Sequence, residues 1–210
     1  MANRASAGNG LTPSMTLGNT PATGGQSKYV IQSNESTSIY QGAPVKTASG
    51  YIVEGTSNTT GTQIGVFNGC FYTAPTTFKQ TWSNYYAQVT PPNSENIQGF
   101  VNDNPWQEYT ILTDAAVTQA GFMETYGLNT AAGSTTTGRS TNTLDIGATN
   151  ATGYQWRLVR VAEDPENEDI TAANCSVIFV QNLNQYNNGV TMSLPKYTQP
   201  NQVTELSKRK

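Results

Sequence analysis

Hydrophobic and polar positions in the middle of this chain alternate in short runs. From residue 28 onward, runs of Tyr, Val, Ile and Phe are interrupted every few residues by Gly, Pro, Asn or Ser-Gly. Such interrupted runs are typical of short antiparallel strands that are joined by tight turns. The sequence therefore predicts a mainly β fold, an antiparallel barrel or sandwich of short strands with little helix.

The predicted strands are separated by recognisable turn signals. Turns are expected at Ser49-Gly50 and at Asn68-Gly69, of which Asn-Gly is a strong hairpin signal. One short helix is predicted over residues 114–121, where an Asp can cap the start and a Gly can end it. The strands are expected at residues 29–32, 44–47, 51–54, 63–67, 70–73, 99–102, 107–112, 155–162 and 176–181.

Three other regions lack this strand pattern. Residues 1–27 contain few core-forming side chains, so they are predicted to be an extended N-terminal arm, either mobile or ordered against a neighbouring subunit. Residues 28–194 are predicted to form a single β-rich body with a long polar loop at 127–153. Residues 195–210 are predicted to be an extended C-terminal tail. No second domain with its own core is expected.

Candidate contact residues are apolar or aromatic side chains. In the arm they would anchor it on a neighbouring subunit. Trp82, Tyr85, Tyr86 and Trp106 could instead form a platform on which sugars stack, or they could be core or intersubunit anchors. Trp82 and Trp156 are expected in the core, while the place of Trp106 stays open. The interaction candidates are Leu11, Pro13, Met15, Leu17, Tyr85, Tyr86 and Trp106.

Charge and targeting signals narrow the choice of partners. Only 12% of the 210 residues are charged, and the net charge is −3. The sequence has no stripe of basic residues that could follow a phosphate backbone, so nucleic-acid binding is not expected. The basic residues 208–210 are interpreted as a solvated tail. The first ten residues lack the apolar run of a signal peptide, and no stretch is long enough to cross a membrane. We therefore expect the protein to be made and folded in a cytoplasm.

Reactive chemistry is sparse. The chain has no histidine, which excludes His-dependent nucleophiles and His metal sites. Asp103, Glu108 and Asp114 could serve a hydrolase only if two of them face each other across a cleft, and acids in turns more often cap backbone amides. The acidic stretch 163–169 is interpreted as a solvated turn rather than a calcium loop. We expect no enzyme activity, no cofactor and no metal.

The two cysteines are expected to be buried free thiols. Cys70 and Cys175 both lie in strand-like surroundings, and a free cysteine behaves as a small core hydrophobe. Two distant cysteines are too few for a disulfide-based scaffold.

Several motifs between residues 28 and 187 together resemble one family. The motifs are IYQGAPV, SGYIV, IGVFNGCFYTAP, SNYY, FVNDNPWQEYTI, TDAAVTQAG, TTTGRSTNTLDIG, QWRLVRV and SVIFVQNLNQY. With these motifs the chain resembles the decoration, or cement, proteins of tailed-bacteriophage heads, which are encoded beside the major capsid protein. The likeness covers about residues 28–187 and consists of scaffold motifs rather than a catalytic signature.

This resemblance implies a structural role in the virion. Such proteins are β-rich, attach to the outside of the expanded head shell and often form trimers. The implied partners are the major capsid protein and further copies of this chain. The implied location is the capsid exterior, after assembly in the host bacterial cytoplasm. The resemblance transfers no functional residue. The alternative is a carbohydrate-binding or receptor-binding protein of the virion surface.

Overall fold

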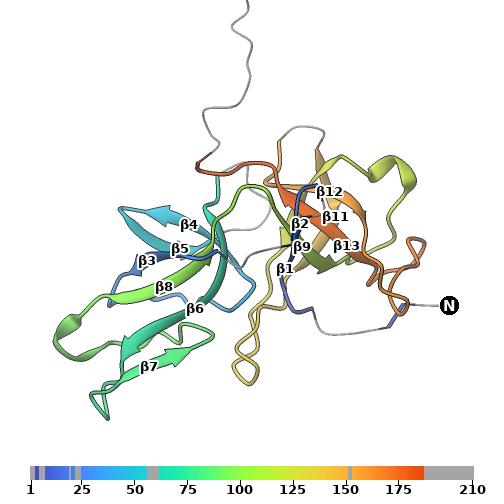
Figure 1. Cartoon of the computed structure of the whole chain (residues 1–210). Helices are drawn as coiled ribbons and strands as arrows, with labels where there is room; N and C mark the ends of the chain where they lie inside the picture. The colour runs from blue at the N-terminus through green and yellow to red at the C-terminus, as the bar shows by residue number, and fades with distance from the viewer. Residues whose placement is uncertain are drawn as a thin grey trace, which may run out of the picture.

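The protein folds into two antiparallel sheets in a sandwich-like arrangement. The computed structural model describes residues 3–4, 8–18, 20–21, 25–55, 62–150 and 153–186. The two sheets lie side by side in Figure 1, and neither closes into a barrel. The predicted fold class is therefore confirmed as mainly β, and the sandwich is the better of the two predicted architectures.

The first sheet has seven strands in the order β11-β10-β12-β13-β9-β1-β2. The sheet curls, because Thr113 after β9 forms an isolated bridge with Leu144 of β11. One bridge is not a continuous ladder, so the curl stays open. The strands are β1 (Thr12–Thr16), β2 (Thr20–Pro21), β9 (Gln107–Leu112), β10 (Thr125–Asn129), β11 (Thr143–Asn150), β12 (Trp156–Val161) and β13 (Ser176–Gln181).

The second sheet is built around one long strand. In the order β3-β8-β6-β4-β5, strand β6 pairs with β8 along one edge, while its other edge pairs with β4 at the start and with β7 at the end. The strands are β3 (Ser27–Ile31), β4 (Pro44–Ala48), β5 (Tyr51–Glu54), β6 (Gly65–Thr73), β7 (Gln80–Ser83) and β8 (Ile97–Asn102).

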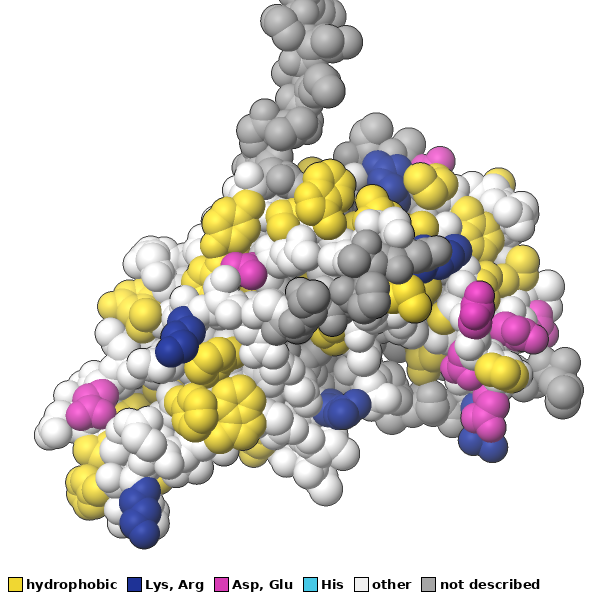
Figure 2. Space-filling model, in the orientation of Figure 1, with side chains coloured by type: hydrophobic (Ala, Val, Ile, Leu, Met, Phe, Trp, Pro, Cys, Tyr) yellow, Lys and Arg dark blue, Asp and Glu magenta, His cyan; other side chains and the backbone are white. Residues whose placement is uncertain are grey.

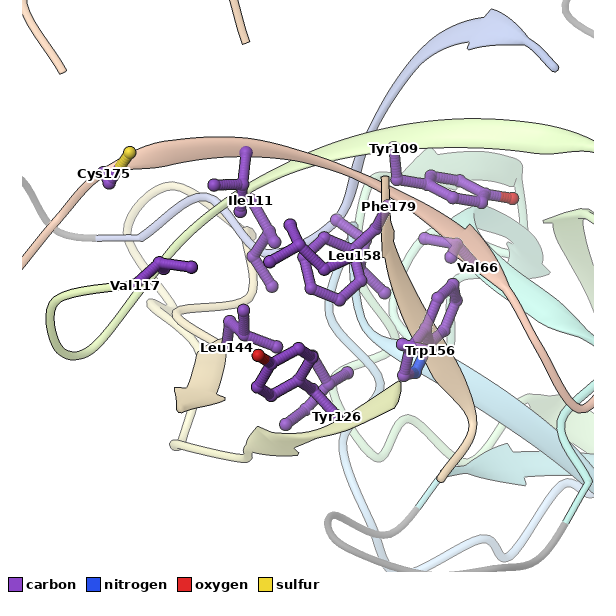
Figure 3. Packing of buried hydrophobic residues seen from close by; sticks show 13 residues of the cluster. Val66, Tyr109, Ile111, Val117, Tyr126, Leu144, Trp156, Leu158, Cys175 and Phe179 are labelled. Atoms are coloured by element: carbon purple, nitrogen blue, oxygen red, sulfur yellow. The ribbon is translucent and has the colours of Figure 1, made fainter. Parts of the chain in front are cut away.

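Each sheet covers its own hydrophobic core. Figure 3 shows the first core, where labelled side chains such as Trp156, Leu158 and Phe179 converge from neighbouring strands. The second core is formed by buried residues that include Ile31, Ile52 and Phe67. Trp156 is fully buried, as predicted, and its ring meets that of Tyr109 edge-on at 5.7 Å.

Contacts across the boundary join the two sheets. Val66 of β6 packs into the core of the first sheet, and the Tyr109 hydroxyl of β9 donates to the Asn102 carbonyl of β8 at 3.0 Å. The Gln181 amide of β13 donates to the Gln63 carbonyl at 2.9 Å. The predicted single body thus contains two cores, and its behaviour as one unit stays a prediction.

The predicted hairpin at Asn68-Gly69 is wrong. Residues 63–67 and 70–73 are not two paired strands, because the single strand β6 runs through this position. The β6–β8 register shifts between Phe67 and Gly69, which marks a bulge. Gly69 has φ +154°, and a Cβ there would lie 2.4 Å from the Trp82 ring of β7. The glycine therefore makes room for a side chain of the neighbouring strand.

The predicted polar loop at 127–153 is also wrong in large part. Strand β10 ends within it and β11 lies inside it, and the two pair with Leu128 opposite Leu144. Both leucines are buried in the first core. Strand forms here although Gly, Asn and Asp are uncommon in strands, because pairing of β10 with β11 and burial of the two leucines outweigh the local propensity. Residues 151–152 lie outside the described residues.

The helix predicted over 114–121 is replaced by extended chain with one 3₁₀ turn, Gln119–Gly121. Val117 is buried in the first core, and its N–H donates to the Ile170 carbonyl at 2.8 Å. Asp114 accepts the Ile146 N–H at 2.9 Å instead of capping a helix. Tertiary contacts therefore override the local capping signal.

The predicted N-terminal arm is docked on its own chain wherever it is described. Strand β1 pairs with β9, and Leu11 is 1% exposed within the first core. The Leu11 N–H donates to the Gly42 carbonyl at 2.9 Å, which ties the segment to the second sheet as well. The prediction that Leu11 anchors a neighbouring subunit is therefore wrong. The predicted tail, 195–210, lies outside the described residues.

Candidate functional site

Three of the predicted contact residues form one exposed apolar surface, which we name the β1 patch: Met15, Leu17 and Trp106. Their exposed fractions are 43%, 45% and 58%. The Leu17 N–H donates to the Trp106 carbonyl at 2.8 Å, and Gln107 donates to the Met15 carbonyl at 2.8 Å, so two distant segments are joined here. Pro13 is exposed on β1 beside a register shift, as expected for a residue without a backbone N–H.

The predicted aromatic platform is not assembled. Tyr86 is 1% exposed in the second core, its hydroxyl donates to the Glu35 carbonyl at 2.9 Å, and burial raises its pKa to about 12. Tyr85 is half-buried and stacks on Tyr40, with ring centroids 5.3 Å apart and rings parallel within 1°. Neither tyrosine joins Trp82 or Trp106 in a common exposed surface.

Trp82 belongs to a different surface, which we name the β6 patch: Val30, Phe71, Trp82 and Phe100. The prediction that Trp82 lies in the core is wrong, since 44% of it is exposed. Its ring lies 5.0 Å from that of Phe71 and 5.4 Å from that of Phe100. Figure 2 shows hydrophobic side chains gathered over β6, β7 and β8.

The β6 patch could have been found in part from alternation along the strand. Cys70 is buried and Phe71 is exposed, so the two point to opposite faces of β6. Phe71 lies opposite Trp82 in the β6–β7 register, and Gly69 lies opposite Phe100 in the β6–β8 register. The pairing of these strands, which sequence does not show, is what places the aromatic residues together.

A polar cleft of about 400 Å³ lies where a loop of the first sheet approaches the second sheet. One wall comes from residues 36–40 and from Glu54 at the end of β5. The other wall comes from residues 130–133, which follow β10. The lining residues are Ser36, Thr37, Ser38, Tyr40, Glu54, Gln88, Thr130, Ala131, Ala132 and Gly133.

Glu54 is the only ionisable carboxylate among the residues that line this cleft. It is half-buried, and burial raises its pKa. Within the described part of the chain, no group donates a hydrogen bond to this carboxyl. The cleft thus contains an acceptor that is partly withdrawn from water and has no hydrogen-bond donor among the residues that the structure describes.

The three carboxylates that sequence offers for hydrolysis are each engaged separately. Glu108 is fully buried and binds Arg160 through both oxygens, at 2.9 and 2.7 Å. Asp103 accepts the Tyr29 hydroxyl at 2.7 Å, and Asp114 accepts the Asn129 amide at 2.7 Å. Each of these contacts joins one carboxylate to a different partner. None of the three carboxylates lines the cleft described above.

The acidic stretch 163–169 holds the start of the chain. The Asn3 amide donates to the Asp169 carbonyl at 2.8 Å, and Arg4 forms an exposed ion pair with Glu166 at 2.8 Å. Among the described residues, no group of three or more Cys, Asp or Glu side chains is placed to hold a metal ion. Sequence alone did not reveal this contact, because its two partners are more than 160 residues apart.

Both cysteines are buried free thiols, as predicted. Cys70 lies in the second core and Cys175 in the first. Burial raises the pKa of Cys70 to about 12, so this thiol is protonated at neutral pH.

Comparison with protein-family models, with curated protein sequences and with solved structures finds no match to this chain. Within the ranges that the structure describes, no helix is both long and apolar enough to span a membrane.

Proposed function

We propose that this protein is a structural component of a tailed-phage virion that decorates the outside of the head shell. The observation that supports this proposal best is the presence of two exposed apolar surfaces, the β1 patch and the β6 patch, on different sheets of the chain. Exposed Trp side chains in such surfaces are typical anchors of protein interfaces.

Two contact surfaces on one molecule allow it to bridge neighbours. The partners in this proposal are the major capsid protein and further copies of this chain, which form a trimer on the shell. Once one patch is bound, the second binds at a high effective concentration, so each contact can be modest on its own. Binding to the closed shell alone stabilises that shell by linkage.

The test is co-sedimentation of the purified protein with head shells assembled from the major capsid protein encoded beside it. Wild-type protein is expected to sediment with the shells and to raise their melting temperature. Trp82→Ala and Trp106→Ala are each expected to weaken attachment by about 2 kcal/mol or more, about 30-fold. Met123→Ala removes an apolar side chain that is 57% exposed outside both patches, so it serves as the matched control.

Two outcomes would count against parts of this proposal. If the wild-type protein does not sediment with shells, the decoration role is refuted. If it does sediment and both Trp variants attach as well as Met123→Ala, the role stands but the patches are not its contact surfaces.

A second candidate function, binding of a carbohydrate, is favoured by the polar cleft. Its walls carry hydroxyl, amide and carboxylate groups, which are the groups that hydrogen-bond sugars. A glycan array probed with the free protein tests this function without any shell, and absence of binding to every glycan would refute it.

A further inference from the structure

The cleft near Glu54 lies outside both the β1 patch and the β6 patch. Its volume of about 400 Å³ falls within the range of about 300–1,000 Å³ that is usual for small-molecule sites. It also lies where segments from two sheets meet, and ligand sites often occupy such boundaries. The chemistry of its walls indicates which ligand it would accept.

Most of the polar groups in the walls are neutral. Hydroxyl groups come from Ser36, Thr37, Ser38 and Thr130, and their side chains make no hydrogen bond within the described residues. No Lys or Arg is among the described residues that line the cleft. An anion would therefore meet an uncompensated carboxylate and no cation, which is unfavourable. A neutral ligand with several hydroxyl groups fits these walls.

Glu54 defines the polar centre of the cleft. Its carboxyl is half-buried and has no hydrogen-bond donor among the described residues. A partly buried acceptor without a partner is unfavourable, and a ligand that donates hydrogen bonds removes that penalty. A carboxylate can accept from two donors at once, and two neighbouring sugar hydroxyls supply such a pair.

The walls are held in place before any ligand arrives. The Tyr40 ring stacks on Tyr85, and a Cβ at Gly133 would lie 2.2 Å from the same ring, so the loop from the first sheet packs directly on it. Gln88 has φ +57° and donates its amide to the Ser36 carbonyl. These contacts fix both walls, which lowers the entropy that binding must overcome.

We propose that this cleft binds a neutral saccharide unit, with Glu54 accepting hydrogen bonds from two adjacent sugar hydroxyls. The hydroxyl groups of residues 36–38 and Thr130 contact the remaining polar edge of the sugar. Tyr40 and the small residues 131–133 border its apolar C–H surface. This inference rests on the second candidate function and names the site at which it operates.

The test is NMR titration of the full-length protein with glucose, galactose, mannose and N-acetylglucosamine at millimolar concentrations. At least one sugar is expected to shift the amide signals of residues 36–40 and 130–133. Glu54→Gln is expected to lower the affinity for that sugar at least about tenfold, because a hydrogen bond to a charged group is stronger than one to a neutral amide. Glu168→Gln is the control, since Glu168 is exposed and lies outside the cleft.

A stability measurement separates loss of the site from loss of the fold. Burial raises the pKa of Glu54, so its charged form destabilises the folded protein at neutral pH. Glu54→Gln should therefore melt at the same temperature as the wild type or higher at pH 7 while binding the sugar more weakly. Ser38→Ala removes one hydroxyl without any change of charge, and it should also lower the affinity for the sugar.

Four results would overturn this inference. The first is that no tested sugar shifts the cleft signals. The second is that Glu54→Gln binds as tightly as Glu168→Gln. The third is that the shifted signals belong to the β6 patch, and the fourth is that a primary amine such as ethanolamine binds the cleft in place of the sugars. A positive glycan array combined with the second, third or fourth result leaves carbohydrate binding in place and refutes only this site.

Discussion

The buried ion pair between Glu108 and Arg160 provides a quantitative test of how the first sheet is held together. Glu108 of β9 is fully buried, and the Arg160 guanidinium of β12 binds both of its oxygens at 2.9 and 2.7 Å. Strand β13 lies between these two strands, so the pair ties three strands together. The hydrogen bonds to Glu108 also raise the pKa of Arg160.

Arg160→Met keeps much of the side-chain length and removes the charge. Loss of one partner of a buried pair typically costs about 3–5 kcal/mol, because the other charge is left uncompensated. The Arg160 side chain is 41% exposed, so water already weakens the attraction. We therefore expect the lower end, about 3 kcal/mol. For a chain of this length that corresponds to a fall in Tm of about 6–12 °C.

The measurement is urea denaturation of wild-type and variant protein at pH 7, where Glu108 in the variant has lost both hydrogen bonds from the guanidinium. Glu108→Gln combined with Arg160→Met should restore most of the stability at pH 7. A difference below about 1 kcal/mol at pH 7, or a double variant that is no more stable than Arg160→Met alone, would refute this reasoning.

Three further predictions follow from the packing. Leu11→Ala should lower the free energy of unfolding in chemical denaturation by about 3 kcal/mol, because Leu11 is buried in the first core; an unchanged value would show that the segment is not docked. Gly69→Ala should cost about 1–3 kcal/mol and shift the NMR indole signal of Trp82, since the new Cβ would lie 2.4 Å from that ring; an unmoved signal contradicts this contact. Cys70 and Cys175 should react with a thiol reagent only as fast as the protein opens, so rapid reaction of the native protein would contradict their burial.

The strands that sequence predicted well are those with a local signal. Tyr51–Glu54 follows a Ser-Gly turn, and Gln107–Leu112 and Ser176–Gln181 are dense in β-branched, aromatic or aliphatic residues. Their bounds agree with the predicted ranges. At Asn68-Gly69 the local signal was equally strong and misleading, because an Asn-Gly pair can sit in a bulge when a large neighbouring ring needs the space.

The strands that sequence missed depend on partners far along the chain. β11 is rich in Thr, Gly and Asn, and it becomes a strand because β10 pairs with it and Leu144 enters the core. Leu11 is one of few apolar residues in a polar segment, so its burial has no local signal. Its contacts, such as the hydrogen bond to Gly42, come from residues more than thirty positions away. Pairing and burial of this kind carry no short-range pattern.

Candidate surfaces were the least predictable from sequence, for the same reason. The sequence indicates Met15 as an anchor of the N-terminal arm and leaves the place of Trp106 open, and the structure brings these two segments together at Leu17. The cleft had no sequence signal, since Ser, Thr and Ala are common in loops throughout this chain. Only the approach of residues 130–133 to the second sheet groups them into a site.

The docked N-terminal segment changes how this protein would bridge its neighbours. A free arm would gain order on binding, and part of the binding energy would be lost to that ordering. Leu11 is already buried in its own chain, so lending it to a neighbour would open the first core. Preformed patches avoid both penalties: Phe71, Trp82 and Phe100 of the β6 patch lie on paired strands, and a backbone hydrogen bond joins Leu17 to Trp106 in the β1 patch. In the proposed decoration role, attachment through these patches should therefore proceed without unfolding of the N-terminal segment.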